Sequence, residues 1–556
     1  MTKPNHFAIG TSDFKDVVKM GATFVDKSLF IKEIMEDFSK VILLTRPRRF
    51  GKTLNMSMLG YFLKLEAQED LFGGLKIKDH AEFCAKHQNK YPLIFLTFRD
   101  IKTVTFEGTI TKLKELFQKL YEENIDLLEE GSLSAPEEEF FQDIRFGRIH
   151  DPDRLSSALS NLMGYIHKKQ GIRPIVLIDE YDMMIQEAYM HGYYDKIMPF
   201  MRSLLGSALK DNKDLEKAVL TGITRVSQES LFSGLNNIQV YTMLSRKYGQ
   251  FFGFTQEEVE SLLPGTMEMD PIKAWYNGYT IGDYQIYNPW SIIKCLSNDG
   301  LLEPYWMNTS SNDLVFSLIE GGPLTVQEKF ENLFQGIPQT QTIDENLTFQ
   351  GIEQNEDAIW TLLFHAGYLN ILSYERDAFG SIIAEIAVPN QEILSIYAKI
   401  IKRRFEKGPR GSTGYREFAD YLVKGDVEKF SNLIRGYIQG TVSFFDLGKH
   451  IPEKVFHAFM LGILASLQHL YHIKSNPEAG KGRADMVMIP KSDKHMGIIL
   501  EFKASTSEKN LEEDAREALV QIEDKRYAYA FPANTRILLL GMAFCGKEMQ
   551  AASKVL

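Results

Sequence analysis

The sequence is poor in cysteine, has no excess of basic residues and contains no long apolar run. Its three cysteines, Cys84, Cys295 and Cys545, lie far apart, so we expect neither a disulfide framework nor a cysteine zinc site. Lysine and arginine number 63 against 74 aspartates and glutamates, so the net charge is −11 and binding to nucleic acid would require a local basic patch. The longest apolar stretches, such as residues 537–544, fall short of the ~18–20 residues of a membrane-spanning helix, and the N-terminus lacks the apolar core of a secretory signal. These absences predict a reduced, cytoplasmic protein without a membrane partner.

The composition and length predict several globular domains. Hydrophobic residues make up 44% of the 556 residues and charged residues 25%, which permits ordinary packing along the whole chain. At roughly 100–200 residues per domain, three or four domains are expected. Short apolar runs at residues 41–45, 93–98, 175–178 and 218–221 alternate with helical patterns. This alternation predicts an α/β fold with a doubly wound parallel sheet in the N-terminal part.

A basic loop after the run 41–45 is the first candidate site. Its residues nearly match G-x-x-x-x-G-K-[ST], with an arginine in place of the first glycine. In such a loop the backbone N–H groups cradle phosphates, the lysine reaches the β- and γ-phosphates, and the threonine hydroxyl binds Mg²⁺. A surface turn is the alternative. The pattern predicts an ATP site at Arg46, Pro47, Arg48, Arg49, Phe50, Gly51, Lys52 and Thr53.

Two acids at the end of the run 175–178 support this interpretation. A parallel strand would place Asp179 at its carboxyl end, beside Mg²⁺ bound to Thr53, and Glu180 next to it to polarise the attacking water. Asp182 also suits the N-cap of the next helix. The loop and the acids together favour ATP binding with Mg²⁺ over a surface turn.

Polar residues after the run 218–221 are candidates for contact with the γ-phosphate. ATPases of this topology place a sensing residue here, so Thr221 or Thr224 suits that role and Arg225 suits charge stabilisation in the transition state. An N-cap and a surface arginine explain the same residues equally well. Arg225 could act within its own subunit or across the interface of a homo-oligomer.

A second constellation lies near the C-terminus. Asp485 lies within the apolar run 484–489, and Glu501 and Lys503 end a second run that begins at residue 497. If the two runs form a hairpin, Asp485 lies near Glu501, and the two carboxylates can bind Mg²⁺ or, alternatively, Mn²⁺. Lys503 can then orient the attacking water and offset the charge on the phosphate. An ordinary pair on an exposed strand edge is the alternative, but the apolar run before Glu501 argues against it. The spacing D-x15-E-x-K is the signature of the PD-(D/E)xK nuclease superfamily.

Further residues suit such a nuclease site. Glu453, at the start of the preceding apolar helix, supplies a third carboxylate as a metal ligand. Gln521 and Lys525 share one face of a helix at 512–525 and suit positioning of the scissile phosphate. A basic patch at 399–410 and the group Lys474, Lys481 and Arg483 offer phosphate contacts. A solvated helical face explains the patch equally well.

These motifs together resemble those of bacterial and archaeal AAA-ATPase-like proteins with a C-terminal PD-(D/E)xK nuclease domain. The resemblance covers nearly the whole chain in order and accounts for the arginine in the phosphate loop. It implies an ATPase module of the additional-strand type, a lid and a restriction-endonuclease-like fold, without implying a substrate. It is carried by residues 10–14, 24–30, 46–53, 178–182, 230–237, 287–289, 367–369, 389–392, 482–485 and 501–503.

We therefore expect four regions and two activities. The regions are an AAA-like P-loop ATPase domain at 1–250, a helical or winged-helix-like lid at 251–325, a helical linker at 326–440 and a nuclease-like domain at 441–556. The expected function is an ATPase that regulates or powers Mg²⁺-dependent cleavage of nucleic acid, with DNA favoured. One alternative is a nucleotide-dependent switch that binds DNA or protein without cutting. Another is an ATPase that acts on a protein partner.

Overall fold

The fold is taken from a computed structural model. The described residues are 6–556, with gaps at 67–69, 130, 226–236, 309–317, 319–325, 327–328, 331, 334–335, 346–348, 350–351, 353–354, 398–410, 441–459, 461–463, 465–466, 468–469, 476–477, 480–481, 526, 528–530, 532–534 and 547. They form two compact units. The first comprises residues 1–264, 278–293 and 341–384, and the second comprises 265–277, 294–340 and 385–556.

A parallel five-stranded sheet forms the centre of the first unit. Its strands follow the spatial order β2-β3-β4-β1-β5, and all paired neighbours are parallel. Strand β4 therefore lies between β1, which leads into the basic loop, and β3, which ends in the acids. This is the additional-strand arrangement that the resemblance implies, and it is confirmed. The strands are β1 (Val41–Thr45), β2 (Leu93–Thr97), β3 (Ile175–Asp179), β4 (Lys217–Gly222) and β5 (Ile238–Tyr241).

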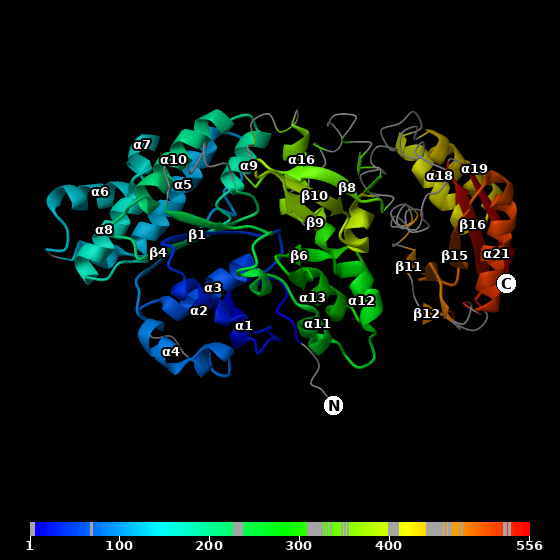
Figure 1. Ribbon diagram of the computed structural model, residues 1–556, viewed down its shortest axis with the longest axis horizontal. Helices are drawn as coiled ribbons and strands as arrows, with labels where there is room; N and C mark the ends of the chain where they lie inside the picture. Colours follow the sequence, from blue (N-terminus) through cyan, green and yellow to red (C-terminus); the bar gives the residue numbers. More distant parts are fainter. Residues whose placement is uncertain are drawn as a thin grey trace. The chain divides into compact units, whose positions relative to one another are not determined.

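Helices cover both faces of this sheet (Figure 1). Because β1, β3 and β4 are buried along their whole lengths, their side chains read as continuous apolar runs. Helices α2 and α3 lie on one face, and α5, α8 and α10 lie on the other. The helices are α1 (Phe14–Lys19), α2 (Leu29–Glu36), α3 (Lys52–Leu63), α4 (Ala81–His87), α5 (Phe106–Glu122), α6 (Ala135–Arg145), α7 (Pro152–Leu155), α8 (Ala158–Gln170), α9 (Met183–Met190) and α10 (Tyr194–Leu209).

The segments after the sheet contain short strands as well as helices. The expected lid region holds α11 (Gln256–Leu262), α12 (Met269–Tyr276), the hairpin β6 (Tyr279–Ile281) and β7 (Tyr284–Ile286), and α13 (Pro289–Ser297). The expected helical linker at 326–440 is not purely helical. It includes a three-stranded sheet in the order β8-β10-β9, built from β8 (Gln339–Ile343), β9 (Asn370–Arg376) and β10 (Ile382–Ala387), and the helix α16 (Glu356–Ala366). Residues 341–384 of this region belong to the same unit as the parallel sheet.

The C-terminal part of the second unit contains a mixed five-stranded sheet. Its order is β11-β14-β15-β16-β17, with β15 and β16 parallel and the other neighbours antiparallel. The expected hairpin between the runs around Asp485 and Glu501 is confirmed, because β14 and β15 pair in antiparallel register. The elements are α18 (Gly411–Lys424), α19 (Val427–Gly440), β11 (Tyr471–Ser475), β12 (Glu478–Ala479), β13 (Gly482–Arg483), β14 (Met486–Pro490), β15 (Gly497–Ala504), α21 (Leu511–Asp524), β16 (Ile537–Cys545) and β17 (Glu548–Val555).

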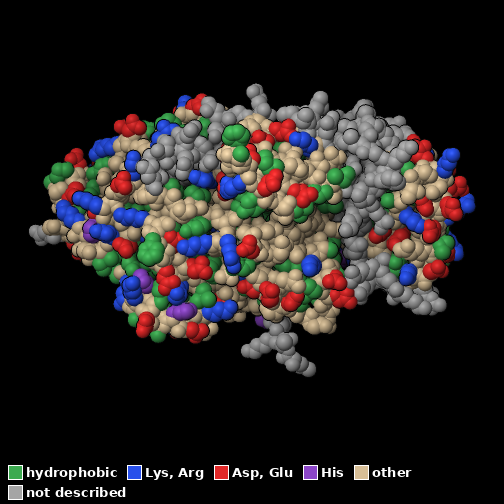
Figure 2. Space-filling model, in the orientation of Figure 1, with side chains coloured by type: hydrophobic (Ala, Val, Ile, Leu, Met, Phe, Trp, Pro, Cys, Tyr) green, Lys and Arg blue, Asp and Glu red, His purple; other side chains and the backbone are tan. Residues whose placement is uncertain are grey.

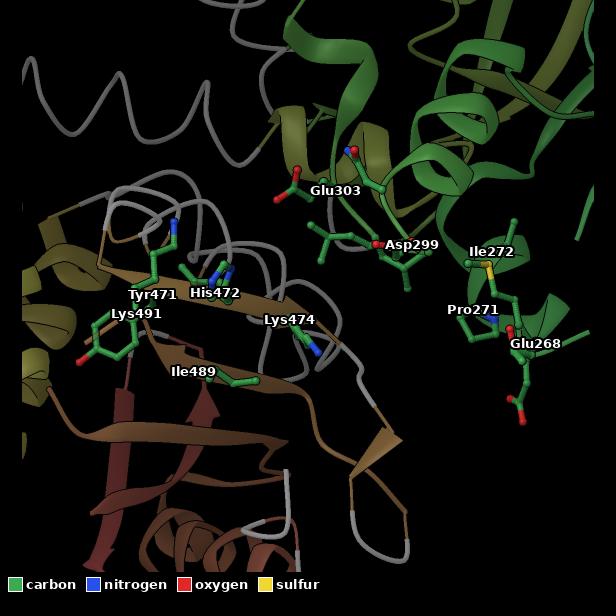
Figure 3. Close-up of a pocket in the computed structure, with 17 residues that line it drawn as sticks. Glu268, Pro271, Ile272, Asp299, Glu303, Tyr471, His472, Lys474, Ile489 and Lys491 are labelled. Carbon is green, nitrogen blue, oxygen red and sulfur yellow. The ribbon is translucent and has the colours of Figure 1, made fainter. Parts of the chain in front are cut away.

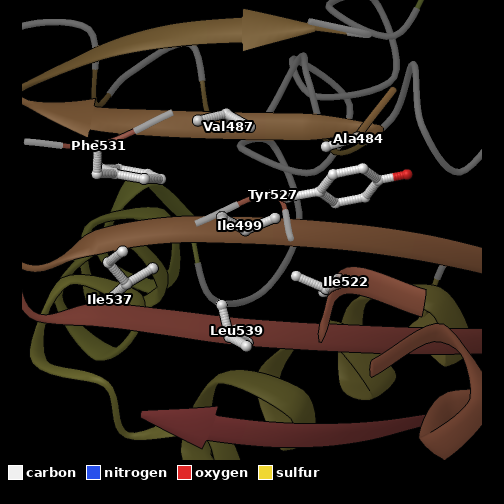
Figure 4. Close-up of a cluster of buried hydrophobic side chains, with 8 residues drawn as sticks. All are labelled: Ala484, Val487, Ile499, Ile522, Tyr527, Phe531, Ile537 and Leu539. Carbon is white, nitrogen blue, oxygen red and sulfur yellow. The ribbon is translucent and has the colours of Figure 1, made fainter. Parts of the chain in front are cut away.

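An apolar core holds α21 against this sheet (Figure 4). Val487, Ile499 and Leu539 project from three neighbouring strands, and Ile522 of α21 packs with them. The same packing fixes the position of α21 relative to β15, which carries Glu501. Among the described residues of the chain, every helix is too short or too polar to cross a membrane.

Candidate nucleotide and nuclease sites

The basic loop joins the end of β1 to the first residue of α3. Gly51 has a φ of 83° and is the N-cap of α3, so glycine suits this left-handed position. The N-terminus of α3 thus opens on the loop, with its first backbone N–H groups free of helical partners. Such a terminus favours a phosphate group.

The side chains of the loop are held by contacts around it. Arg48 donates to Gln186 Oε1 over 3.2 Å. The Arg49 guanidinium lies over the Trp290 ring, 4.4 Å from its centroid, and the Phe50 ring packs edge-on against a tyrosine of β6. These contacts fix the backbone of the loop before any ligand binds, which reduces the entropy lost on binding.

Arg46 differs from the expected role of a phosphate-binding side chain. It is fully buried, and its guanidinium donates to three backbone carbonyls, those of Thr45 at 2.7 Å, Tyr241 at 3.0 Å and Thr242 at 2.8 Å. Burial lowers its pKa to about 9. The side chain therefore lies under the loop and ties β1 to β5, so only the Arg46 backbone remains a candidate for phosphate contact.

Lys52 points back into the loop that precedes it. Its ammonium donates to the carbonyl oxygens of Arg46 and Pro47, at 2.9 Å each. Burial lowers the pKa of Lys52, and the nearby charges of Glu180 and Asp179 raise it. The lysine is thus close to both acids that follow β3. Backbone carbonyls are weaker partners for an ammonium than phosphate oxygens, so these residues fit a nucleotide phosphate.

Asp179, the last residue of β3, connects this strand to helix α3 and strand β4. One carboxylate oxygen accepts from the Thr53 hydroxyl at 2.7 Å, and the other accepts from the Thr221 hydroxyl at 2.5 Å. Asp179 is fully buried. A hydroxyl and a carboxylate in contact are the oxygen donors that Mg²⁺ prefers, so the pair fits the ion. Thr221 therefore lies beside the expected metal ligand.

Asp182 organises the loop after β4. Its Oδ2 accepts from the backbone N–H groups of Ile223 and Thr224, at 3.0 and 2.9 Å, and from the Thr224 hydroxyl at 2.9 Å. Asp182 is also the N-cap residue of α9. The Thr224 hydroxyl thus bonds to Asp182. Thr221 is the threonine that contacts Asp179, next to Thr53.

Glu180 has the backbone geometry of a strained residue. Its φ of 53° lies in the left-handed region, which costs a non-glycine residue about 1–3 kcal/mol. Burial raises its pKa, and Lys52 lowers it. Strain of this kind is common at functional sites. Arg225 is partly buried at the end of a described segment, and within the described part of the chain its Nε has no hydrogen-bond partner.

Gly367, at the C-cap of α16, lies against the basic loop. Its φ is 87°, and a Cβ at this position would approach the Pro47 Cβ to 2.9 Å. We expect Gly367→Ala to displace Pro47, destabilise the first unit by about 1–3 kcal/mol and weaken ATP binding. Gly380 is the matched control, because its φ is 86° but its added Cβ would meet nothing within 4 Å. Urea unfolding and nucleotide titration would show a stability loss in both variants and a binding loss only in Gly367→Ala; equal nucleotide affinities would contradict the contact.

His365 of α16 is fully buried, and neither ring nitrogen has a hydrogen-bond partner among the residues that the structure describes. Burial lowers its pKa from 6.5 to about 4; the charge of Glu345 raises it, and those of Arg46 and Arg225 lower it. As pH falls below 6.5, the imidazole is protonated in the unfolded chain before it is protonated in the folded chain. The free energy of unfolding therefore falls between pH 6.5 and 4.

We expect this histidine to make the first unit about 2 kcal/mol less stable at pH 5 than at pH 7.5. His365→Phe removes the titrating group, so its urea midpoint should change less over the same pH interval. The comparison of the two pH slopes isolates His365 from all other titrating groups. Equal slopes would show that the histidine is not held neutral.

The nuclease candidates Asp485 and Glu501 lie together at the β14–β15 hairpin. The Glu501 Oε2 atom accepts from the backbone N–H of Asp485 at 3.2 Å, and Asp485 Oδ2 accepts from the backbone N–H of Phe502 at 2.7 Å. Glu501 is buried, and burial raises the pKa of Asp485. A buried and a half-buried carboxylate that lie side by side supply oxygen ligands of the kind that divalent cations prefer. Within the described residues, no third acid or histidine joins them in a metal-binding group.

Helix α21 supplies further groups to this site. Gln521 donates to Glu501 Oε1, a contact with the proposed metal ligand and not the phosphate contact that the sequence suggests for this side chain. Lys503 follows Glu501 by two residues on β15, and its ammonium pairs with Glu517 of α21. The carboxylates of Glu501 and Asp485 also raise the pKa of Tyr527, after the larger effect of burial. Glu517 and Tyr527 were not expected from the sequence, because neither belongs to the D-x15-E-x-K pattern.

Other predicted residues lie outside the description. Glu453 and the basic patch at 399–410 are not among the described residues, and neither is Lys481. Most of the motif at 230–237 also lies outside them.

The fold and these clusters define a P-loop-like α/β domain followed by a nuclease-like domain. Comparison with known families agrees. Residues 8–232 match the family described as predicted AAA-ATPase, and residues 451–554 match the PD-(D/E)XK nuclease superfamily. The chain therefore contains one domain of each kind, as its motifs indicate.

A similar protein is described as "Uncharacterized protein in vnfD 5'region" from Azotobacter chroococcum mcd 1. It is 26% identical over 534 residues, which cover 94% of this chain and 92% of that protein. The similarity thus extends through both domains and the region between them.

Proposed function

We propose that the N-terminal domain hydrolyses ATP and that this reaction regulates or powers Mg²⁺-dependent cleavage of DNA by the C-terminal domain. The observation that supports the proposal is the presence of two separate clusters of acids and lysine in one chain. Lys52, Thr53 and Asp179 form the first, and Asp485 and Glu501, with Lys503 on the same strand, form the second.

In the first cluster, the proposed role of each residue follows from its atoms. Lys52 would exchange the loop carbonyls for phosphate oxygens, which bind an ammonium more strongly. Thr53 and Asp179 would hold Mg²⁺, which neutralises charge on the β- and γ-phosphates when it is bound. Glu180 would orient the attacking water, and Thr221 would keep Asp179 in place through its hydroxyl.

In the second cluster, Asp485 and Glu501 would hold the metal ion, which activates water and stabilises a charged phosphate when it is bound. The backbone N–H of Phe502 orients Asp485, and Gln521 orients Glu501. Lys503 would leave Glu517 and face the scissile phosphate, whose developing charge it would stabilise.

A cleavage assay with the full-length chain tests the proposal. Supercoiled plasmid and Mg²⁺ should be incubated with the protein alone, with ATP and with a non-hydrolysable analogue, beside a Lys503→Ala variant. We expect cleavage by the wild type, loss of cleavage in the variant and a change in rate with nucleotide. If nucleotides leave both the cleavage rate and the DNA affinity unchanged, the two domains are not coupled.

The contact between Lys503 and Glu517 supports a second candidate, a nucleotide-dependent switch that binds DNA or protein without cutting. This ion pair neutralises the lysine that cleavage would need. The same assay separates the candidates, because a switch would bind plasmid in a nucleotide-dependent manner and leave it intact.

A further inference from the structure

Two side chains of β11, the edge strand of the nuclease sheet, lie on the sheet face that carries the proposed metal ligand Glu501. Lys474 pairs with Val487, and Val487 pairs with Ile499. Residues paired across neighbouring strands project from the same face, and so do residues two apart on one strand. Lys474 therefore lies on the face that carries Glu501. By the same two-residue period, His472 lies on this face too.

The distance between the two positions suits a nucleic-acid strand. Two inter-strand spacings and one two-residue step separate Lys474 from Glu501, so their Cα atoms are about 12 Å apart. A stacked strand spans this distance with about three or four phosphates, at 3.4 Å of rise each. Val487 and Ile499, which lie between the two positions, are buried in the apolar core, so a strand that contacts both β11 and the proposed metal ligands passes along the rim of the sheet.

The basic side chains at this edge form no ion pair with another described residue. His472 and Lys474 are exposed, and no ion pair or hydrogen bond involves the side chains of Lys474 or Lys491 in the described part of the chain. By contrast, Lys503 pairs with Glu517, and Lys554 on the opposite edge strand pairs with Glu523. Figure 2 shows basic and acidic side chains interspersed over the face in view. A local group of cations without ion pairs is therefore where phosphates would bind.

A hollow of about 750 Å³ lies against this edge. His472, Lys474 and Lys491 line one side of it, together with Ile489. The other side is formed by residues 266–268, 271–272 and 298–303, and Figure 3 shows Glu268, Asp299 and Glu303 there. A phosphate chain in the hollow would be attracted by one side and repelled by the other.

We propose that this hollow is where a nucleic-acid strand enters the nuclease domain. Lys474 and Lys491 bind its phosphates, and His472, which lies between these two lysines along the edge, contacts the strand there. Glu268, Asp299 and Glu303 weaken this binding, so the acidic side sets how readily substrate enters. The inference rests on the proposed nuclease function and names the substrate path of that site.

Binding measurements with the full-length chain test the inference. A fluorescent DNA oligonucleotide should be titrated at several salt concentrations with chains that also carry Asp485→Asn, which prevents cleavage. We expect Lys474→Ala with Lys491→Ala to weaken binding about 10-fold or more and to reduce the slope of log K against log salt by about 1.4–1.8. Replacing Glu268, Asp299 and Glu303 by their amides should tighten binding. Lys554→Ala is the control, since it removes a lysine from the opposite edge strand.

The outcomes separate this inference from the proposed function. If the parent chain binds DNA and the two-lysine variant binds equally well with the same salt slope, the path is wrong while the nuclease proposal stands. If Lys554→Ala weakens binding as much as the two-lysine variant, attraction is general and the path is again wrong. If the parent chain does not bind the oligonucleotide at all, both the path and the proposed DNA substrate fail.

Discussion

Asp179→Asn is expected to lower ATP hydrolysis about 100-fold to 1,000-fold without unfolding the first unit. The asparagine keeps the size of the side chain and one acceptor oxygen, so the hydroxyls of Thr53 and Thr221 can still find partners by rotation. It removes the negative charge that would hold Mg²⁺ next to Thr53. Because Asp179 is fully buried, the loss of its charge also removes a desolvation cost, and the unfolding midpoint should not fall.

Thr221→Val provides the graded control for this prediction. It keeps the volume and removes only the hydroxyl that donates to Asp179 Oδ1. We expect a loss of about 10-fold, since the carboxylate remains but is less well oriented. Phosphate release at saturating ATP and urea unfolding are the two measurements. Hydrolysis by Asp179→Asn within a few-fold of the wild type would show that this acid is not a metal ligand.

The sequence predicts strands β1 to β4 of the parallel sheet to within one or two residues at each end. Strands β1, β3 and β4 are buried on both faces, so their composition alone marks them. Strand β5 was missed because its four residues are short and only partly buried, which leaves no apolar run. The glutamate-rich segment 129–139 is typical of a solvated surface loop, but α6 begins within it at Ala135, with a capping box of Ser134 and Glu137. The Ser-x-x-Glu pattern of this capping box is present in the sequence, but the glutamates around it also fit a solvated loop.

The contacts around the candidate sites are harder to predict than the motifs. The contact of Gly367 with Pro47 joins positions about 320 residues apart, and no local pattern encodes it. The position of Arg46 in the motif does not tell whether its side chain faces phosphate or the core. Only the fold shows that it bonds to carbonyls of β1 and β5. In the nuclease cluster, strand periodicity correctly places Glu501 and Lys503 on one face, but the pairing of Lys503 with Glu517 depends on how α21 packs.

Asp485→Asn and Glu501→Gln are each expected to reduce DNA cleavage about 100-fold to 1,000-fold or more while leaving the melting temperature unchanged or slightly higher. Burial raises the pKa of Asp485, so its charged form is disfavoured without a cation. An amide of the same shape can still accept from the backbone N–H of Phe502, as the carboxylate does. Stability and activity should therefore separate, because the charge that weakens the folded domain is the charge that would hold the metal ion.

Glu517→Gln is the matched control, because it makes the same chemical change on α21 without touching the two buried acids. It releases Lys503 from its ion pair, so we expect cleavage to be equal to or faster than that of the wild type.

Plasmid cleavage with Mg²⁺ and thermal melting with and without Mg²⁺ are the measurements. In the wild type Mg²⁺ should raise the melting temperature of the nuclease domain, and in Asp485→Asn that rise should disappear. If Asp485→Asn keeps the rise and loses cleavage, the ion binds elsewhere and Asp485 acts on the substrate. If it keeps both, the carboxylates of Asp485 and Glu501 are structural, and their charge must be balanced by the protein rather than by a metal ion.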